Sequence, residues 1–215
     1  MPGETGSSTG PRPVILLHGL GRTAASMWWL SRLLDVAGMK AHPVNYPSTR
    51  QSLGDNAATV LEQIQHQFSN QQIDLVGHSM GGVISRRLCL DDNGLNVRRV
   101  VQLGAPNLGS ALADRMGPFW AVRKACGPAI EDLRATTRAV APNPRIHAIA
   151  GTGGCRLING ALKGPHDGAV TVRSAWAGAG CRYRSGAIHT LMPQSNEVAR
   201  HVIHALSRED GPTAP

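Results

Sequence analysis

The strongest constraint on the fold of this chain is the run Gly77-His78-Ser79-Met80-Gly81, which follows a short apolar stretch that begins at Ile73. A serine between two glycines, after a strand and before a helix, is typical of a sharp turn that lifts the hydroxyl above the edge of a sheet. Glycine at positions 77 and 81 makes room for that turn, because a side chain at either position would collide with the neighbouring helix or strand. Ser79 is therefore the predicted nucleophile. The alternative, a chance serine in a turn of small residues, is disfavoured by the strand, the helix and the partner residues described below.

Strand-like and helical patterns alternate on both sides of Ser79. Strands are predicted over 13–17, 41–46, 73–78, 97–103 and 145–150, and helices over 26–38, 52–68, the segment after Ser79, and 196–206. The first strand is apolar without interruption, which indicates a strand covered on both faces and hence a parallel sheet. The order of these elements predicts an α/β fold with a doubly wound, mostly parallel sheet flanked by helices.

A chain of 215 residues is long enough for one domain with a substantial core. We predict a single domain over residues 13–207, with flexible tails at 1–12 and 208–215, because both ends are rich in small and polar residues. Between about 107 and 143 the pattern loosens into short helical segments. This stretch is predicted to form a small cap-like excursion above the carboxyl ends of the strands.

The net charge of +8 is spread along the chain, with only 4% aromatic residues and no block of five or six basic residues. That distribution excludes a nucleic-acid groove and leaves weak contact with an anionic membrane surface open. Because no signal peptide is visible, a cytoplasmic location is expected, with a secreted mature form as the alternative. The sequence does not indicate an oligomeric state.

The four cysteines have no CxxC spacing of the kind that binds zinc or forms a redox pair. Cys89 is expected to be a small core residue inside the helix after Ser79. A bridge between Cys155 and Cys181 is one alternative, and free thiols are the other, favoured in the cytosol. The state of Cys126 stays open.

Two residues later in the chain are candidates for the catalytic partners of Ser79. A serine hydroxyl needs a base within hydrogen-bond distance, and that base needs a group that orients it. His189 follows the last strand-like segment, directly before the closing helix, and Asp167 lies in a glycine-flanked loop before it. The order serine, acid, histidine is the one expected on this type of sheet. The other histidines are assigned to packing, local bonding or the surface, among them His78, and the acidic residues of the excursion (Asp114, Glu131 and Asp132) to solvated helix positions.

Two backbone amides are predicted to hold a negative substrate oxygen. Met80, at the start of the helix after Ser79, provides one N–H. Leu20, in the turn His18-Gly19-Leu20-Gly21 after the first strand, provides the other. The glycines on either side of Leu20 allow close approach of the substrate. An ordinary strand-to-helix turn is the alternative for this segment.

Several of these motifs together resemble the α/β-hydrolase superfamily, and within it the small bacterial lipases and esterases. The resemblance rests on HGLGRT at 18–23, GHSMGG at 77–82, GAPNLGS at 104–110, Asp167-Gly168 and His189, and it extends from about residue 14 to 206. It implies a minimal α/β-hydrolase fold and cleavage of carboxylic esters through an acyl-serine, with no cofactor. The chain is short, so any lid is minimal, which favours soluble small-molecule esters over emulsified lipid.

Aromatic residues are expected near the carboxyl ends of the predicted strands, where they suggest an apolar acyl pocket. The predicted substrate contacts are Trp28, Asn107, Leu108, Phe119 and Trp120, with core packing as the alternative for the aromatic ones. Esters of short to medium acyl chain are the expected substrates. A thioesterase, amidase or acyltransferase using the same three residues is a second hypothesis, and a non-catalytic binding protein on a hydrolase scaffold is a third.

Overall fold

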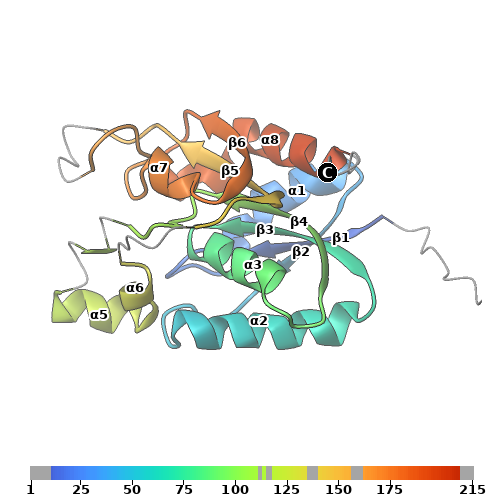
Figure 1. The fold of residues 1–215 in the computed structure, drawn as a ribbon, viewed down its shortest axis with the longest axis horizontal. Coiled ribbons are helices and arrows are strands. Elements are labelled where there is room, and N and C mark those ends of the chain that lie inside the picture. The colour runs from blue at the N-terminus through green and yellow to red at the C-terminus, as the bar shows by residue number, and fades with distance from the viewer. Residues whose placement is uncertain (1–10, 111–112, 115–117, 135–139, 156–161, 209–215) are drawn as a thin grey trace, which may run out of the picture.

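A computed structural model describes residues 11–110, 113–114, 118–134, 140–155 and 162–208 of the chain. Its centre is a six-stranded sheet in the order β2-β1-β3-β4-β5-β6, in which each neighbouring pair is parallel (Figure 1). The strands are β1 (Pro13–Leu17), β2 (Lys40–Val44), β3 (Gln72–His78), β4 (Asn96–Leu103), β5 (Asn143–Gly151) and β6 (Ala179–Ser185). The predicted doubly wound parallel sheet is confirmed.

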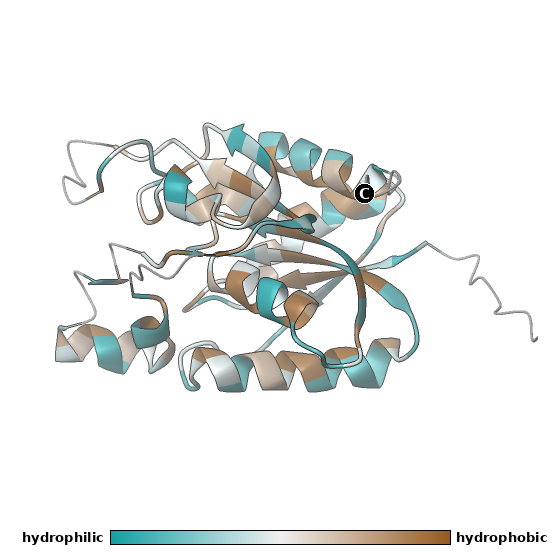
Figure 2. Ribbon diagram, viewed as in Figure 1, coloured by the Kyte–Doolittle hydropathy of each residue, from teal (hydrophilic) through white to brown (hydrophobic). Residues whose placement is uncertain are grey.

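Helices cover both faces of this sheet. The longer ones are α1 (Trp28–Val36), α2 (Leu53–Phe68), α3 (Met80–Leu90) and α8 (Asn196–Ser207). Side chains of α2 and α3 pack with Ile15 and Leu17 of β1, whereas those of α1 and α8 pack with Val14 and Leu16. Successive residues of a strand point to opposite faces, so the unbroken apolar run of β1 serves two separate cores. Figure 2 shows the hydrophobic colour on the central strands and a mixture of both colours on α2 and α8.

The predicted helix over 52–68 matches α2, and its start has a clear physical cause. The Ser52 Oγ accepts a hydrogen bond from the backbone N–H of Asp55 at 3.1 Å, which caps the first turn. The helix predicted over 26–38 begins later than expected. Ser26 lies inside a short 3-10 helix, η1 (Ala24–Met27), where its hydroxyl donates to the Thr23 carbonyl, and α1 begins only at Trp28.

Shorter elements gather beyond the carboxyl ends of the strands. The predicted excursion between β4 and β5 contains α5 (Trp120–Cys126) and α6 (Ala129–Asp132), which stand away from the sheet in Figure 1. Residues 111–112, 115–117 and 135–139 of that prediction lie outside the described residues, as do most residues of the two predicted tails. After β5 come α7 (Val172–Ala175), β6, and a second 3-10 helix, η2 (His189–Gln194). The last strand-like segment expected before His189 is β6.

The strand order places a crevice at a defined position. From β1 the chain moves to β2 on one side and then returns to place β3 on the other side of β1. In a parallel α/β sheet, ligands bind outside the carboxyl ends of the strands at such a reversal. Leu20 follows β1 and Ser79 follows β3, so both lie at this point. Within the described residues, none of the helices is long and apolar enough to cross a membrane.

Candidate active site

Ser79 occupies a sharp turn between β3 and α3. Its backbone angles are φ 54° and ψ −120°, a conformation that a non-glycine residue adopts only at a cost of about 1–3 kcal/mol. A Cβ added at Gly77 would lie 2.3 Å from the Gly81 carbonyl oxygen, and one added at Gly81 would lie 2.4 Å from the Leu17 carbonyl oxygen. The predicted need for glycine at both positions is confirmed, because backbone fills the space on each side.

Three side chains far apart in the sequence meet above the sheet edge. The Ser79 Oγ lies 3.0 Å from Nε2 of His189, and Nδ1 of the same ring lies 2.7 Å from the Asp167 Oδ2. With Nδ1–H donating to the carboxylate, Nε2 is the acceptor for the serine hydroxyl. The structure therefore brings together the three residues that the sequence predicts, in the order of contacts that a serine nucleophile needs.

Asp167 is held by the backbone of its own loop. The carboxylate is 2% exposed, and its Oδ1 accepts hydrogen bonds from the N–H groups of Ala169 at 2.9 Å and Val170 at 2.7 Å. Its carbonyl oxygen also accepts from the His189 N–H at 2.9 Å. These bonds leave Oδ2 for the imidazole, so the acid and the base are fixed relative to each other through both side chain and backbone.

Gly104, at the end of β4, supports this pair and was not assigned a role from the sequence. Its φ is +57°, and a Cβ there would lie 2.9 Å from the Asp167 Oδ2 and 3.1 Å from the His189 Nδ1. Any side chain would displace one of the two groups. A glycine directly after a predicted strand was the available signal.

His78 was assigned to packing or local bonding, and its actual partner is distant in the sequence. Its buried ring donates from Nε2 to the backbone carbonyl of His189 at 2.9 Å, and the two rings are 5.0 Å apart. Burial, reinforced by repulsion from the His189 ring, lowers the pKa of His78 to about 3. The ring is therefore neutral near pH 7. It joins the nucleophile turn to the loop that carries the base.

The turn after β1 passes directly over Ser79. A Cβ added at Gly19 would lie 3.2 Å from the Ser79 Cβ. The Tyr46 hydroxyl donates to the His18 carbonyl, and the two rings stack with their centroids 4.1 Å apart. Desolvation lowers the pKa of the His18 imidazole, which keeps it neutral in this contact. Tyr46 thus braces the turn that carries Leu20, a support that sequence reasoning did not identify.

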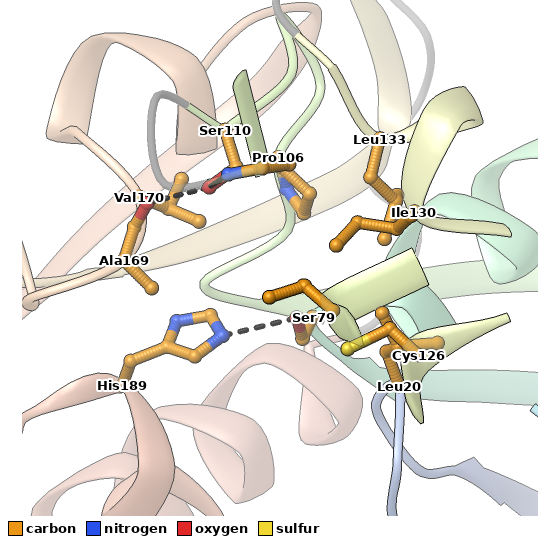
Figure 3. Close-up of a pocket in the computed structure, with 12 residues that line it drawn as sticks. Leu20, Ser79, Pro106, Ser110, Cys126, Ile130, Leu133, Ala169, Val170 and His189 are labelled. Carbon is orange, nitrogen blue, oxygen red and sulfur yellow. Dashed lines mark hydrogen bonds between the residues drawn. The ribbon is translucent and has the colours of Figure 1, made fainter. Parts of the chain in front are cut away.

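A cavity of about 300 Å³ opens in front of Ser79 (Figure 3). Besides Ser79 and His189, it is lined mainly by apolar side chains: Leu20, Pro106, Ser110, Ala113, Val122, Cys126, Ile130, Leu133, Ala169 and Val170. We call the side formed by Ser79, Ala169, Val170 and His189 the strand-end wall. The side formed by Val122, Cys126, Ile130 and Leu133, which come from α5, α6 and the residue after α6, is the cap wall.

The predicted substrate contacts lie elsewhere. Trp28, Phe119 and Trp120 are 59%, 60% and 75% exposed, and none of the five residues, all within the described parts of the chain, is among those that line the cavity. Asn107 instead bonds to the Gln102 side chain and the Ala175 carbonyl, and the Leu108 N–H donates to the Ser174 hydroxyl. The expected cap does border the cavity, through residues that include Val122 and Cys126, whereas Phe119 and Trp120 are exposed.

All four cysteines lie in the described part of the chain and are free thiols. Cys89 is buried on α3, as predicted, and Cys126 borders the cavity. Among the described residues, no cluster of three or more His, Cys, Asp or Glu side chains is arranged to hold a metal ion.

Comparison with known proteins places the chain in a family. A family model described as a domain of unknown function, DUF7379, matches residues 7–118, just over half of the chain. The chain belongs to the DUF7379 family. The matched region contains β1, the turn with Leu20, the nucleophile turn and β4, whereas Asp167 and His189 lie beyond it. No curated protein matches the sequence significantly.

Three solved structures with related folds are distant from this chain in sequence. The mature lipase BlEst2 of Bacillus licheniformis superposes with a TM-score of 0.70 at 21% identity, over 94% of each chain. The lin2722 gene product of Listeria innocua has a TM-score of 0.63 at 17% identity, over 94% of this chain and 96% of that one. The RedJ thioesterase of Streptomyces coelicolor has a TM-score of 0.61 at 15% identity, over 92% and 87%. This DUF7379 member therefore has the α/β-hydrolase fold that its motifs resemble.

Proposed function

We propose that this protein is a serine carboxylic ester hydrolase that cleaves esters of short to medium acyl chain through an acyl-serine intermediate. The observation that carries the proposal is the chain of contacts from the Ser79 hydroxyl through the His189 ring to Asp167, at the floor of an apolar cavity. A serine used only for structure has no need of a base at 3.0 Å that is itself oriented by a buried carboxylate.

The proposed reaction has two half-steps. The Ser79 Oγ attacks the ester carbonyl carbon while the His189 Nε2 takes the hydroxyl proton, and Asp167 stabilises the imidazolium that forms. The imidazolium then returns that proton to the departing alcohol, leaving an acyl-serine. In the second half-step His189 takes a proton from water, whose oxygen attacks the acyl carbon. The carboxylic acid leaves and the Ser79 hydroxyl is restored.

The proposed oxyanion donors are the N–H groups of Met80 and Leu20. Met80 is the first residue of α3, so its N–H has no acceptor within the helix. Leu20 lines the cavity, in the turn that Tyr46 holds over Ser79. Removing one such donor from a serine hydrolase costs about 10²–10³-fold in kcat.

The cavity supports the choice of acyl group. Its volume of about 300 Å³ is at the small end of the range of ligand sites, about 300–1,000 Å³. The cap wall offers aliphatic side chains and the Cys126 thiol, which suit a hydrocarbon chain better than a polar acyl group. Short to medium chains therefore fit the space next to Ser79.

A fluorophosphonate probe tests the proposal directly, because it labels only a serine activated as a nucleophile. We expect labelling of the native protein and of Ser110→Ala, which changes another serine of the same cavity, and loss of labelling in Ser79→Ala. Native protein that does not react, or a Ser79→Ala variant that still does, would contradict the proposed chemistry. It would favour a non-catalytic binding protein.

A substrate panel then separates the acyl-transfer classes. It consists of p-nitrophenyl acetate, butyrate, octanoate and laurate, set beside an acyl-CoA and an acyl anilide. We expect the highest kcat/KM on the butyrate or octanoate ester. Faster turnover of the acyl-CoA would instead indicate a thioesterase, the activity named for the RedJ neighbour.

A further inference from the structure

The exposed hydrophobic side chains of this protein are unevenly distributed. Among the described residues, eight large hydrophobic side chains are exposed: Trp28, Trp29, Val36, Leu90, Phe119, Trp120, Ile188 and Leu191. Scattered single residues of this kind are normal on a soluble protein, whereas a cluster marks a surface that binds something. Six of the eight belong to segments at the carboxyl edge of the sheet.

These six residues lie in segments that contain or closely follow residues lining the cavity (Leu20, Val122, Cys126 and His189), and we call them the rim. Trp28 and Trp29 begin α1 just after the turn that carries Leu20, and Ile188 and Leu191 flank His189. The two segments are in contact, because the Gln194 amide donates to the Ser26 carbonyl and the Trp29 indole donates to the Asn196 side chain, each at 3.0 Å. Trp120 begins α5, which provides part of the cap wall, and Phe119 directly precedes it.

The two remaining exposed residues lie at the other edge. Val36 ends α1 and Leu90 ends α3, so both are a helix length away from the carboxyl ends of the strands. Both are aliphatic and exposed, at 81% and 46%. They are therefore hydrophobic surface residues like those of the rim, but at a different position. This makes them natural controls.

Charge identifies the kind of surface that fits the rim. The aromatic pair is followed by Arg123 and Lys124, and α5 itself contains no acidic residue, whereas Glu131 and Asp132 lie in α6. Arg123 is 60% exposed although its Nε lies 3.4 Å from the Glu131 Oε1. Every residue of α5 is at least partly exposed, and Lys124 is exposed. Since the whole chain carries +8, two copies of it would repel each other, whereas an anionic surface would attract it.

We propose that the rim docks on an anionic lipid surface. Aromatic rings with adjacent basic groups suit the boundary between headgroups and acyl chains, with the rings buried and the cations beside the phosphates. Because α5 carries Trp120 of the rim and two residues that line the cavity, docking through the rim would bring the lipid close to the candidate site. The inference goes beyond the proposed function, since docking does not require a reactive Ser79.

The test uses full-length Ser79→Ala protein, so that turnover does not alter the lipids. Its co-sedimentation is measured with vesicles of equal parts phosphatidylcholine and phosphatidylglycerol, and with phosphatidylcholine vesicles alone. We expect partitioning into the anionic vesicles at low ionic strength and a steep loss with added salt. Combining Phe119→Ser with Trp120→Ser should lower the partition coefficient about tenfold or more, and combining Arg123→Glu with Lys124→Glu should do the same on anionic vesicles only.

The control combines Val36→Ser with Leu90→Ser and should keep the partition coefficient within about twofold of the parent. Circular dichroism melting checks that each variant is folded. Failure to partition into anionic vesicles, or an equal loss in the control, would overturn the proposal. A change of oligomeric state in the Phe119 and Trp120 variant, with vesicle binding unchanged, would instead assign the rim to contact between copies. Fluorophosphonate labelling of the native protein is measured separately, so a failure of docking is distinguishable from a failure of the proposed chemistry.

Discussion

The two walls of the cavity are built in opposite ways. The strand-end wall consists of turns at strand ends in which backbone packs so closely on backbone that a Cβ added at Gly77 or Gly81 would lie only 2.3 or 2.4 Å from a carbonyl oxygen. Its reactive groups are held by hydrogen bonds in which main-chain amides donate and main-chain carbonyls accept. The cap wall rests on aliphatic side chains, and every residue of its helix α5 is at least partly exposed.

This difference separates two properties of the site. Positions on the strand-end wall are over-determined, so a change there should abolish activity or folding outright. Positions on the cap wall are set by packing of a small peripheral element, so a change there should alter which substrate fits and leave the bond-making groups in place. The four experiments that follow test this separation, from the largest expected effect to the smallest.

Replacing the base should have the largest effect. For His189→Ala we expect kcat on p-nitrophenyl butyrate to fall by about 10⁴-fold or more, because Ser79 loses its proton acceptor. The melting temperature should change little, since the ring is partly exposed. The matched control is His204→Ala on α8, an exposed histidine, which should keep kcat within about twofold. A fall of less than tenfold in kcat for His189→Ala would show that the strand-end wall does not provide the catalytic base.

Filling the nucleophile turn should destabilise the fold. In Gly81→Ala the new Cβ would meet the carbonyl oxygens of Leu17 and His18 at 2.4 and 2.5 Å, and neither can move without disrupting β1. We expect a loss of about 3 kcal/mol or more in the free energy of unfolding, measured by urea denaturation.

Gly54→Ala on α2 is the control for that experiment. Its Cβ would have no neighbour closer than 3.5 Å, so a gain of about 0.5 kcal/mol is expected from the stiffer unfolded chain. If the two variants are equally stable, the turn is not as tightly packed as its contacts indicate.

Narrowing the cap wall should change selectivity. In Val122→Trp an indole ring replaces the smaller valine side chain and extends from α5 into the cavity. We expect kcat/KM for p-nitrophenyl octanoate to fall about 10–100-fold relative to that for p-nitrophenyl acetate. Ala121→Trp changes the neighbouring exposed residue, which does not line the cavity, and should leave the ratio unchanged. An equal fall on both esters would show that the cap wall also positions the reacting groups.

The smallest effect concerns the pH dependence of stability. His78 has a pKa of about 3 in the folded protein against 6.5 for the free side chain, so the unfolded chain binds more protons between these values. Stability therefore falls as the pH drops through this window, by about 1 kcal/mol from this group between pH 7.5 and 5.5. His78→Gln keeps an amide donor for the His189 carbonyl and removes the titration.

We expect the variant to have a flatter profile of unfolding free energy against pH, measured by urea denaturation at each pH. His66→Gln, which changes an exposed histidine of α2, should keep the wild-type profile. Parallel profiles for wild type and His78→Gln would show that another group causes the loss of stability at low pH.

The same contrast explains what could be predicted from the sequence. Ser79, Gly77 and Gly81 are recognisable because a sharp strand-to-helix turn restricts residue type locally, and Asp167 and His189 follow from the order of strand ends. The inner lining of the cap could not be predicted, because the face that a short helix turns inward depends on its packing. Phe119 and Trp120 were expected to contact the substrate because they are aromatic and follow the end of a predicted strand, whereas Val122 and Cys126, further along the same segment, border the cavity.

The residues that support the active site could not be predicted from the sequence either. The bond from His78 to the His189 carbonyl joins residues 111 positions apart, and the brace from Tyr46 to the His18 carbonyl joins residues 28 apart. Neither pairing has a local pattern. Each becomes visible only once the strand order has brought the segments together.

Both ends of the segment that forms α5 and α6 emerge from adjacent strands, β4 and β5, which pair directly in parallel. Added residues in this connection would extend outward from the sheet, at an entropic penalty that grows only slowly with loop length. Such additions would leave the distance between the Ser79 hydroxyl and the His189 imidazole unchanged, because Ser79 precedes the connection and His189 follows β6. This connection is therefore the position at which related chains are expected to differ most in length, and with length in the acyl groups they accept.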